Sequence, residues 1–305
     1  MNTQSNAVPQ SPSESQVVAP VVISEARRMY WSVRRELWEN RSIYIAPLAV
    51  AAVALFSFSL SSIVGIWETP LRLNPAQPQA PYEMAAGLMM ITGIVVSVFY
   101  CLDALHGERR DRSILFWKSL PVSDVTTVLA KASIPFVILP LLTFAISLAL
   151  QWLMLLLSSA VLLVSGQSVT ELWTNLPILR MSLLMLYHIL TAHTLWPAPV
   201  YCWLLLVSGW PRRATFLWAA LPLLAIAGVE QIAFHTWHFA ALVGSRLIGA
   251  APMAASTPPD MFPTDPMTHI APGSFLSSPG LWIGLAMAAA FLAAAVRLRH
   301  YREPI

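Results

Sequence analysis

Histidines in apolar segments are the residues of this sequence with the clearest potential for chemistry. They form two pairs with one glutamate nearby, namely His188, His193, His235, His238 and Glu230. Imidazole nitrogens bind haem iron and metal ions, so a haem held by two histidines is the sharpest chemical interpretation. The first pair is separated by about 140° around a helix, whereas the second pair shares one face. Neither spacing matches a metal motif, so no metal ligand is assigned and hydrogen-bonded histidines are the plainer interpretation.

A second candidate group lies in the sequence HGERRDRSILFWKSLPVSD, residues 106–124. Its first part mixes charges of both signs, in Glu108, Arg109, Arg110, Asp111 and Arg112. A signal for membrane topology would need only positive charges, whereas mixed charges can pair with one another or with a protein surface, where they provide orientation and specificity more than affinity. The stretch therefore indicates more than a signal for topology.

Aromatic residues follow these charges at helical spacing. Phe116, Trp117 and Leu120 stand at positions i, i+1 and i+4 of a predicted helix, which Pro121 ends. Ser123 can then cap the next helix, which continues into an apolar run. The pattern predicts a helix, a sharp turn and a second helix, which together form an exposed knob.

Transmembrane helices are the elements that must position these residues. Apolar residues make up 57% of the 305 positions and charged residues only 11%, a balance that is unusual for a water-soluble globule. A bilayer core needs about 20 apolar residues of helix. Six runs of suitable length are present, at residues 43–67, 84–105, 134–164, 179–207, 216–242 and 281–296. The sequence therefore predicts an all-α, polytopic membrane protein.

The distribution of arginine and lysine predicts that both termini are cytoplasmic. With the N-terminus inside, all but three of the 18 basic residues fall in cytoplasmic segments, the exceptions being Arg72, Arg180 and Arg246. The net charge of +3 is thus a topological signal, and we expect no nucleic-acid partner. Residues 1–22 are predicted to be a disordered cytoplasmic tail, residues 23–42 an amphipathic interfacial helix that binds membrane lipid, and residues 43–305 the six-helix domain.

Prolines interrupt the fourth run. They remove helix hydrogen bonds and are expected to kink or unwind the segment, which leaves carbonyl groups that must face protein or a cavity. Aromatic and histidine side chains flank this kink. The resulting candidate substrate path comprises His188, His193, Trp196, Pro197, Pro199 and Tyr201. A kinked helix that only packs against its neighbours is the alternative.

At this point the sequence resembles the permease subunits of type-2 ABC (ABC-2) exporters. In that family an amphipathic helix precedes the first span, and the loop between spans two and three forms a coupling helix. The family pattern in this loop is a glutamate, basic residues, a short helix and then Leu with Pro-Val-Ser. The matching positions are Glu108, Arg109, Arg110, Leu120, Pro121, Val122 and Ser123.

The resemblance implies a transport subunit of the bacterial inner membrane with no catalytic residue of its own. The chain has no G-x-x-x-x-G-K-[ST] pattern, so a partner ATPase subunit is expected to bind ATP and Mg. A homodimer, or a heterodimer with a second permease chain, is implied as well. The interface with the ATPase is expected at Glu108, Arg109, Arg110, Arg112, Phe116, Trp117, Leu120 and Pro121. Both Glu108 and Trp117 are expected to be exposed there.

In permeases of this type, short re-entrant helices between spans five and six close the outer gate. The sequence VEQIAFHTWHFAALVG is a candidate for the start of such an element, with Glu230, His235 and His238 as candidate gate residues. The alternative is the end of one long span followed by a loop. Two other functions stay open, namely a membrane-embedded haem or metal protein that uses the histidines, and a permease-like sensor or immunity protein that binds a ligand without transporting it.

Overall fold

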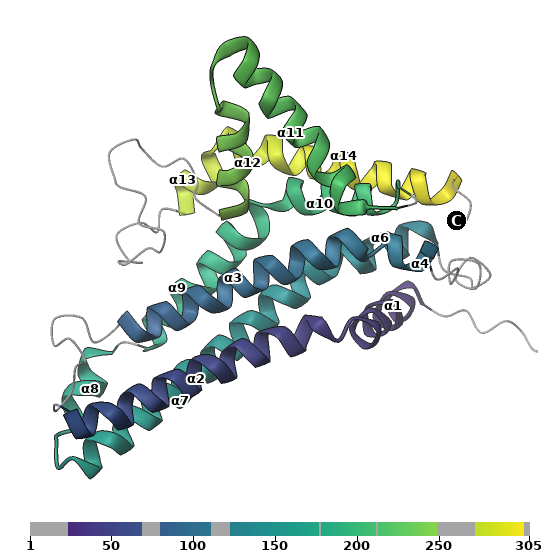
Figure 1. The fold of residues 1–305 in the computed structure, drawn as a ribbon. Coiled ribbons are helices and arrows are strands. Elements are labelled where there is room, and N and C mark those ends of the chain that lie inside the picture. Colours follow the sequence, from purple (N-terminus) through teal and green to yellow (C-terminus); the bar gives the residue numbers. More distant parts are fainter. Residues whose placement is uncertain are drawn as a thin grey trace, which may run out of the picture.

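The computed structural model describes residues 24–68, 80–110, 123–176, 178–211, 213–248 and 272–301. All regular secondary structure within these ranges is helical, as predicted (Figure 1). Six helical stretches of the described residues are long and apolar enough to cross a membrane, which agrees with the six predicted runs. The fold is therefore that of an all-helical, multi-pass membrane protein. The predicted tail, residues 1–22, lies outside the described residues.

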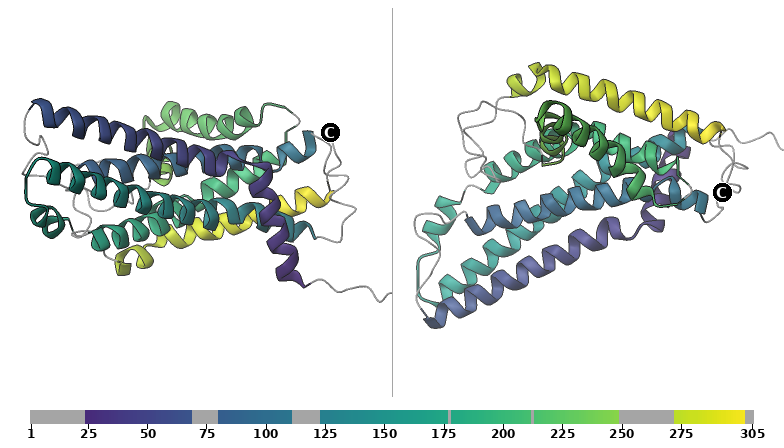
Figure 2. Two further views of the ribbon diagram at one scale, coloured as in Figure 1. Left: turned by 90° about the horizontal axis from the view of Figure 1, so that it is seen from below. Right: turned by 45° about the horizontal axis from the view of Figure 1, so that its top comes forward.

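Helix α1 (Glu25–Glu39) lies across one end of the bundle at a steep angle to α2 (Ser42–Glu68), as Figures 1 and 2 show. Ser24 caps α1, because its side chain accepts a hydrogen bond from the backbone of Arg27. Val33 and Leu37 pack against the core of the bundle. The buried face of α1 therefore attaches this helix to the rest of the protein.

Helices α2, α3 (Ala80–Asp103) and α7 (Leu139–Val164) form one half of the bundle (Figure 1). Tyr82 and Met89 of α3 are buried there against Met154 and Leu155 of α7. Near the middle of α3, a Cβ atom added at Gly93 would lie 3.1 Å from Oγ1 of Thr143. The glycine therefore permits the close approach of α3 and α7.

The helical stretch that contains the third predicted run begins at Asp124, before the first residue of that run, Ile134. After the short helix α4 (His106–Arg110), Ser123 caps α6 (Asp124–Ser133), which confirms the predicted cap. Helix α6 continues through a π-helical turn, η1 (Ile134–Ile138), into α7 without a break. The predicted knob between α4 and α6, residues 111–122, lies outside the described residues.

The fourth run is broken, as its prolines predict. After α8 (Thr170–Asn175), α9 (Ile178–Leu190) passes into a second π-helical turn, η2 (Thr191–Leu195), and the chain turns at Trp196 and Pro197 before α10 (Ala198–Ser208). The single span expected over 179–207 is therefore two segments. Proline at position 197 lacks the N–H that would continue the helix from η2.

The predicted fifth span, 216–242, is also shorter than expected. Helix α11 (Thr215–Phe234) ends at His235, which adopts a left-handed conformation, and α12 (His238–Ile248) then folds back along it (Figure 1). The left-handed residue reverses the chain. A helical hairpin is thus present where the sequence left two alternatives open. Helix α13 (Pro272–Ser277) precedes α14 (Pro279–Tyr301), which packs along α10.

Candidate functional site

A buried charge network surrounds Glu108 at the end of the bundle where α1 lies. The carboxylate of Glu108 is 4% exposed and accepts a hydrogen bond from Arg35 of α1 at 2.9 Å. Lys131 of α6 lies 3.2 Å from the same oxygen. Arg299 of α14 lies 2.5 Å from the other oxygen. One carboxylate therefore joins cations from three helices that are far apart in the sequence.

Glu36 extends this network toward the membrane-spanning helices. Its carboxylate accepts hydrogen bonds from Nζ of Lys131 at 2.8 Å and from the hydroxyl of Tyr100, on α3, at 2.9 Å. Arg299 also donates to Asp124, the first residue of α6, at 3.0 Å. We call these six residues the charge network: Arg35, Glu36, Glu108, Asp124, Lys131 and Arg299.

Each cation of the charge network has at least one carboxylate as its partner. Such pairing is required because an ion removed from water is tolerated only with a partner. Burial alone would lower the pKa of Arg35, but its hydrogen bond to Glu39 and the charge of Glu108 raise that pKa above its ordinary value. Arg35 consequently stays cationic and keeps α1 attached to α4.

The expected exposure of Glu108 is wrong, and its neighbour Arg109 is buried too. Arg109 donates to the backbone carbonyl of Gly209, at the end of α10, at 2.6 Å. Helix α4 turns both side chains inward because the cations and carbonyl groups that satisfy them lie inside the bundle. Arg110 is exposed. The remaining predicted interface residues, Arg112, Phe116, Trp117, Leu120 and Pro121, lie outside the described residues.

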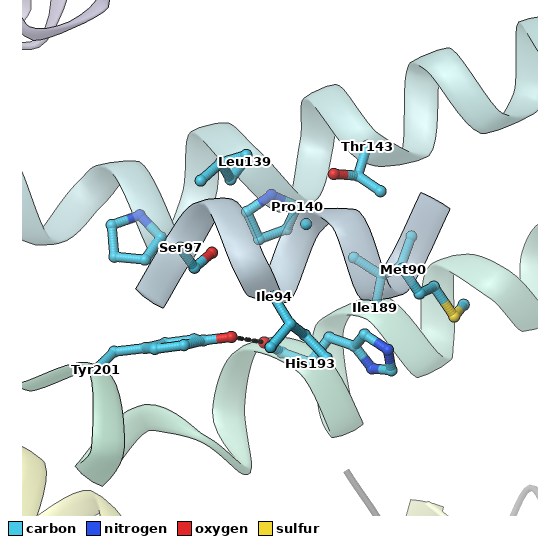
Figure 3. A pocket seen from close by; sticks show the side chains of 11 residues that line it. Met90, Ile94, Ser97, Leu139, Pro140, Thr143, Ile189, His193 and Tyr201 are labelled. Carbon is cyan, nitrogen blue, oxygen red and sulfur yellow. Dashed lines mark hydrogen bonds between the residues drawn. The ribbon is translucent and has the colours of Figure 1, made fainter. Parts of the chain in front are cut away.

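A small cavity, lined mainly by apolar side chains, lies among α3, the η1–α7 segment, η2 and α10 (Figure 3). His193 and Tyr201, both in the candidate substrate path, line it together with Ser97 and Thr143. The hydroxyl of Tyr201 donates to the backbone carbonyl of His193 at 3.3 Å. The volume of the cavity is about 20 Å³, whereas pockets for drug-sized ligands measure about 300–1,000 Å³. It therefore does not accommodate a substrate of that size.

The other residues of the candidate path do not reach this cavity. His188 uses Nδ1 for a hydrogen bond with the carbonyl of Leu184, one turn earlier in its own helix, at 2.9 Å. Trp196 is buried toward the α11–α12 hairpin, where its indole N–H donates to the carbonyl of Ser245 at 3.0 Å. Pro197 and Pro199 begin α10. The structure thus divides the predicted path into a cavity and a separate contact with the hairpin.

The three candidate gate residues meet at the turn of the α11–α12 hairpin. The carboxylate of Glu230 accepts hydrogen bonds from the backbone N–H groups of His238 and Phe239, each at 2.8 Å, and from the hydroxyl of Thr236. His235 ends α11 through its backbone N–H, which donates to Gln231. Glu230 therefore caps α12 from the preceding helix, since it satisfies N–H groups that have no partner within α12.

Arg246 fixes the other end of α12. Its guanidinium carbon lies 3.9 Å from the ring centroid of Trp196, and its nitrogens donate to the carbonyls of Trp196 at 3.1 Å and Gly280 at 2.6 Å. The side chain is buried against Gly284 of α14. The hairpin, the break in the fourth run and the start of α14 are therefore joined by one residue.

Sequence reasoning overlooked the structural roles of Glu36, Lys131, Arg246 and Arg299. Lys131, Arg246 and Arg299 were interpreted only as markers of topology. A signal was present, because isolated charges beside apolar helices are costly and need a partner. The sequence does not show which distant residue provides that partner.

Among the described residues, no three His, Cys, Asp or Glu side chains gather as the ligands of a metal ion would. Comparison of the chain with known protein families, curated proteins and solved structures finds no match. The described part of the chain is thus an all-helical protein with six helices able to cross a membrane. It has a charge network at one end and a helical hairpin held by Arg246.

Proposed function

We propose that this chain is the permease subunit of an ATP-binding cassette exporter of the ABC-2 type. A separate ATPase subunit hydrolyses ATP, and the chain couples that hydrolysis to movement of a substrate across the bacterial inner membrane. The observation that carries the proposal is that one arginine binds described residues on either side of positions 111–122. Glu108, before this loop, and Asp124, after it, both bind Arg299.

This arrangement suits a loop that receives force from a partner. The loop leads directly into a helical stretch that runs without a break from Asp124 to Val164. Glu108 also connects α4 to α1 and α14. A displacement of the loop therefore moves several spans together. Coupling further requires that the loop fits the ATP-bound and ATP-free partner differently, because otherwise no equilibrium shifts.

The end of the bundle that holds the charge network is the cytoplasmic end in this proposal. Trp31 and Trp38 on α1 are 49% and 68% exposed, and Arg34 lies over both indole rings, at 5.1 and 4.7 Å from their centroids. Tryptophan suits the headgroup region and arginine suits anionic lipid. Helix α1 accordingly lies on the inner membrane surface.

The α11–α12 hairpin is the outer gate in this proposal. Its turn carries Glu230, His235 and His238, and Arg246 attaches it to the break in the fourth span. Bending at that break would therefore move the hairpin with it. A homodimer or a heterodimer would place two such hairpins around one central path.

The first test is purification of the full chain from its native membranes in mild detergent, followed by mass spectrometry of what remains bound. We expect a soluble subunit with a phosphate-binding Walker A motif, in stoichiometric amount. A lone chain that is coloured or loaded with metal would overturn the proposal and support the histidine-based alternative.

The second test uses Trp117→Ala in the reconstituted complex. We expect weaker retention of the ATPase subunit and loss of its coupling to transport, with the chain still folded. Trp282→Ala is the matched control, because Trp282 is a 60% exposed tryptophan at the opposite end of α14 from Arg299. Equal retention and equal coupling in both variants would contradict the proposed role of the loop.

A further inference from the structure

The outer face of α1 carries a stripe in which arginine and tryptophan alternate. Arg27, Trp31, Arg34 and Trp38 stand at positions i, i+4, i+7 and i+11, which lie on one side of an α-helix. Both indole rings are exposed, and Arg27 is exposed as well. We call these four residues the basic stripe. Large aromatic rings gathered on an open face indicate an interaction surface.

Arg34 is held by the two indole rings of the basic stripe. Its guanidinium carbon lies 5.1 Å from the ring centroid of Trp31 and 4.7 Å from that of Trp38. A guanidinium stacked on aromatic rings still presents N–H donors that suit a phosphate group. Neither Arg34 nor Arg27 forms an ion pair with a carboxylate among the described residues. Both cations therefore remain able to pair with an anion from outside the chain.

The acidic residues of α1 lie away from the basic stripe. Glu36 is buried on the other side of the helix, where it belongs to the charge network, and Glu39 binds Arg35. Glu25, in the first turn, is about 160° around the helix from Arg27. The stripe thus combines cations with aromatic rings and has no acidic residue of α1 beside it. This chemistry suits anionic headgroups at the edge of an apolar layer.

The opposite face of α1 attaches the same helix to the charge network. Arg35 binds Glu108 of α4 at 2.9 Å, and Glu36 binds Lys131 of α6 at 2.8 Å. Because the helix runs without a break from Glu25 to Glu39, a ligand that fixes the outer face also restricts Arg35 and Glu36 on the inner face. Whatever occupies the basic stripe therefore influences the ion pairs behind it.

We infer that the basic stripe binds the headgroups of anionic phospholipid, and that this lipid holds the charge network in place. The guanidinium groups pair with the phosphates, while the indole rings enter the boundary between headgroups and acyl chains. Neutral phospholipid also has phosphate groups, but its own cations oppose the guanidinium groups. The inference rests on the membrane placement of α1 in the proposed function. It adds the charge of the lipid and the effect of that lipid on α4.

Hydrogen–deuterium exchange of the full chain in nanodiscs tests this inference. One set of nanodiscs contains only phosphatidylcholine, which is neutral, and the other also contains phosphatidylglycerol, which is anionic. We expect the amides of α1 to exchange several-fold more slowly with phosphatidylglycerol, and those of residues 106–110, in α4, to slow as well. A higher salt concentration should reduce the difference, because salt screens exposed charges. Exchange that is the same in the two membranes, for either segment, would overturn the inference.

Arg34→Gln removes the charge that the two indole rings hold. We expect the effect of phosphatidylglycerol on the exchange of α1 to be much smaller in this variant. Arg180→Gln is the matched control, because Arg180 is exposed at the start of α9, at the end of the bundle away from α1 (Figure 1). The effect of phosphatidylglycerol should be unchanged there. An equal effect in both variants would contradict the role of Arg34 and with it the inference.

A protein surface is the alternative occupant of the basic stripe. If a second copy of the chain covers the stripe, α1 is protected in phosphatidylcholine too and phosphatidylglycerol adds nothing, a result that would refute lipid binding. The inference and the proposed function can fail separately, because the exchange measurement uses the chain without an ATPase subunit. A chain that purifies alone refutes the proposed function, whereas the dependence of α1 on anionic lipid is measured independently of that result.

Discussion

Nη1 of Arg299 lies 2.5 Å from Oε2 of Glu108, a residue 191 positions earlier in the chain. This contact joins the end of the last helix to the short helix α4, with which the helical stretch Ala80–Arg110 ends. Because Glu108 also binds Arg35 and Lys131, it is the central member of the charge network. The beginning and the end of the helical domain are therefore attached to each other through one carboxylate.

Glu108→Gln should destabilise the protein strongly. The neutral amide leaves buried cations without their counter-charge, and breaking a buried pair in this way typically costs about 3–5 kcal/mol. Glu39→Gln is the control, because Glu39 is 47% exposed and also binds Arg35, and exposed pairs contribute at most about 1 kcal/mol. Thermal unfolding in detergent measures both variants, and similar melting temperatures for the two would contradict the central role of Glu108.

Glu36 and Lys131 should be energetically coupled. Lys131→Met leaves two buried carboxylates with one cation fewer, and Glu36→Gln leaves Lys131 with one acceptor fewer. In the double variant the two losses partly cancel, so its destabilisation should be smaller than the sum of the single effects by about 1–3 kcal/mol. Chemical denaturation of the four proteins of this cycle provides the measurement. Simple additivity would mean that the 2.8 Å contact carries no coupling.

Gly284→Ala should loosen the attachment of α12. The added Cβ atom would lie 2.7 Å from Nη1 of Arg246, so the guanidinium has to leave its position against Trp196 and Gly280. Hydrogen–deuterium exchange of α12 should then be faster. Gly228→Ala is a control in α11, because its Cβ atom would meet nothing within 4 Å. Exchange in α12 that is the same in both variants would exclude a fixing role for Arg246.

Glu230→Gln should expose the first amides of α12 to exchange. The amide side chain retains one acceptor oxygen in place of two, while Glu230 serves the N–H groups of both His238 and Phe239. Thr236→Val removes only a donor to the same carboxylate, so it should have a smaller effect. Hydrogen–deuterium exchange of residues 238 and 239 should therefore be slowest in the wild type, faster in Thr236→Val and fastest in Glu230→Gln. Equal protection in wild type and Glu230→Gln would mean that the carboxylate is not the cap.

The sequence by itself determined the helical class, the six apolar segments, the cap at Ser123 and the break at Pro197. Each of these depends on local chemistry, namely apolar length, a hydroxyl group before a helix and a missing N–H. Only the tertiary structure decided which charges pair, that Glu108 is buried, and that α12 folds back at His235. Ion pairs between residues separated by up to 191 positions leave no periodic pattern in a sequence, because their distance depends on how the helices pack.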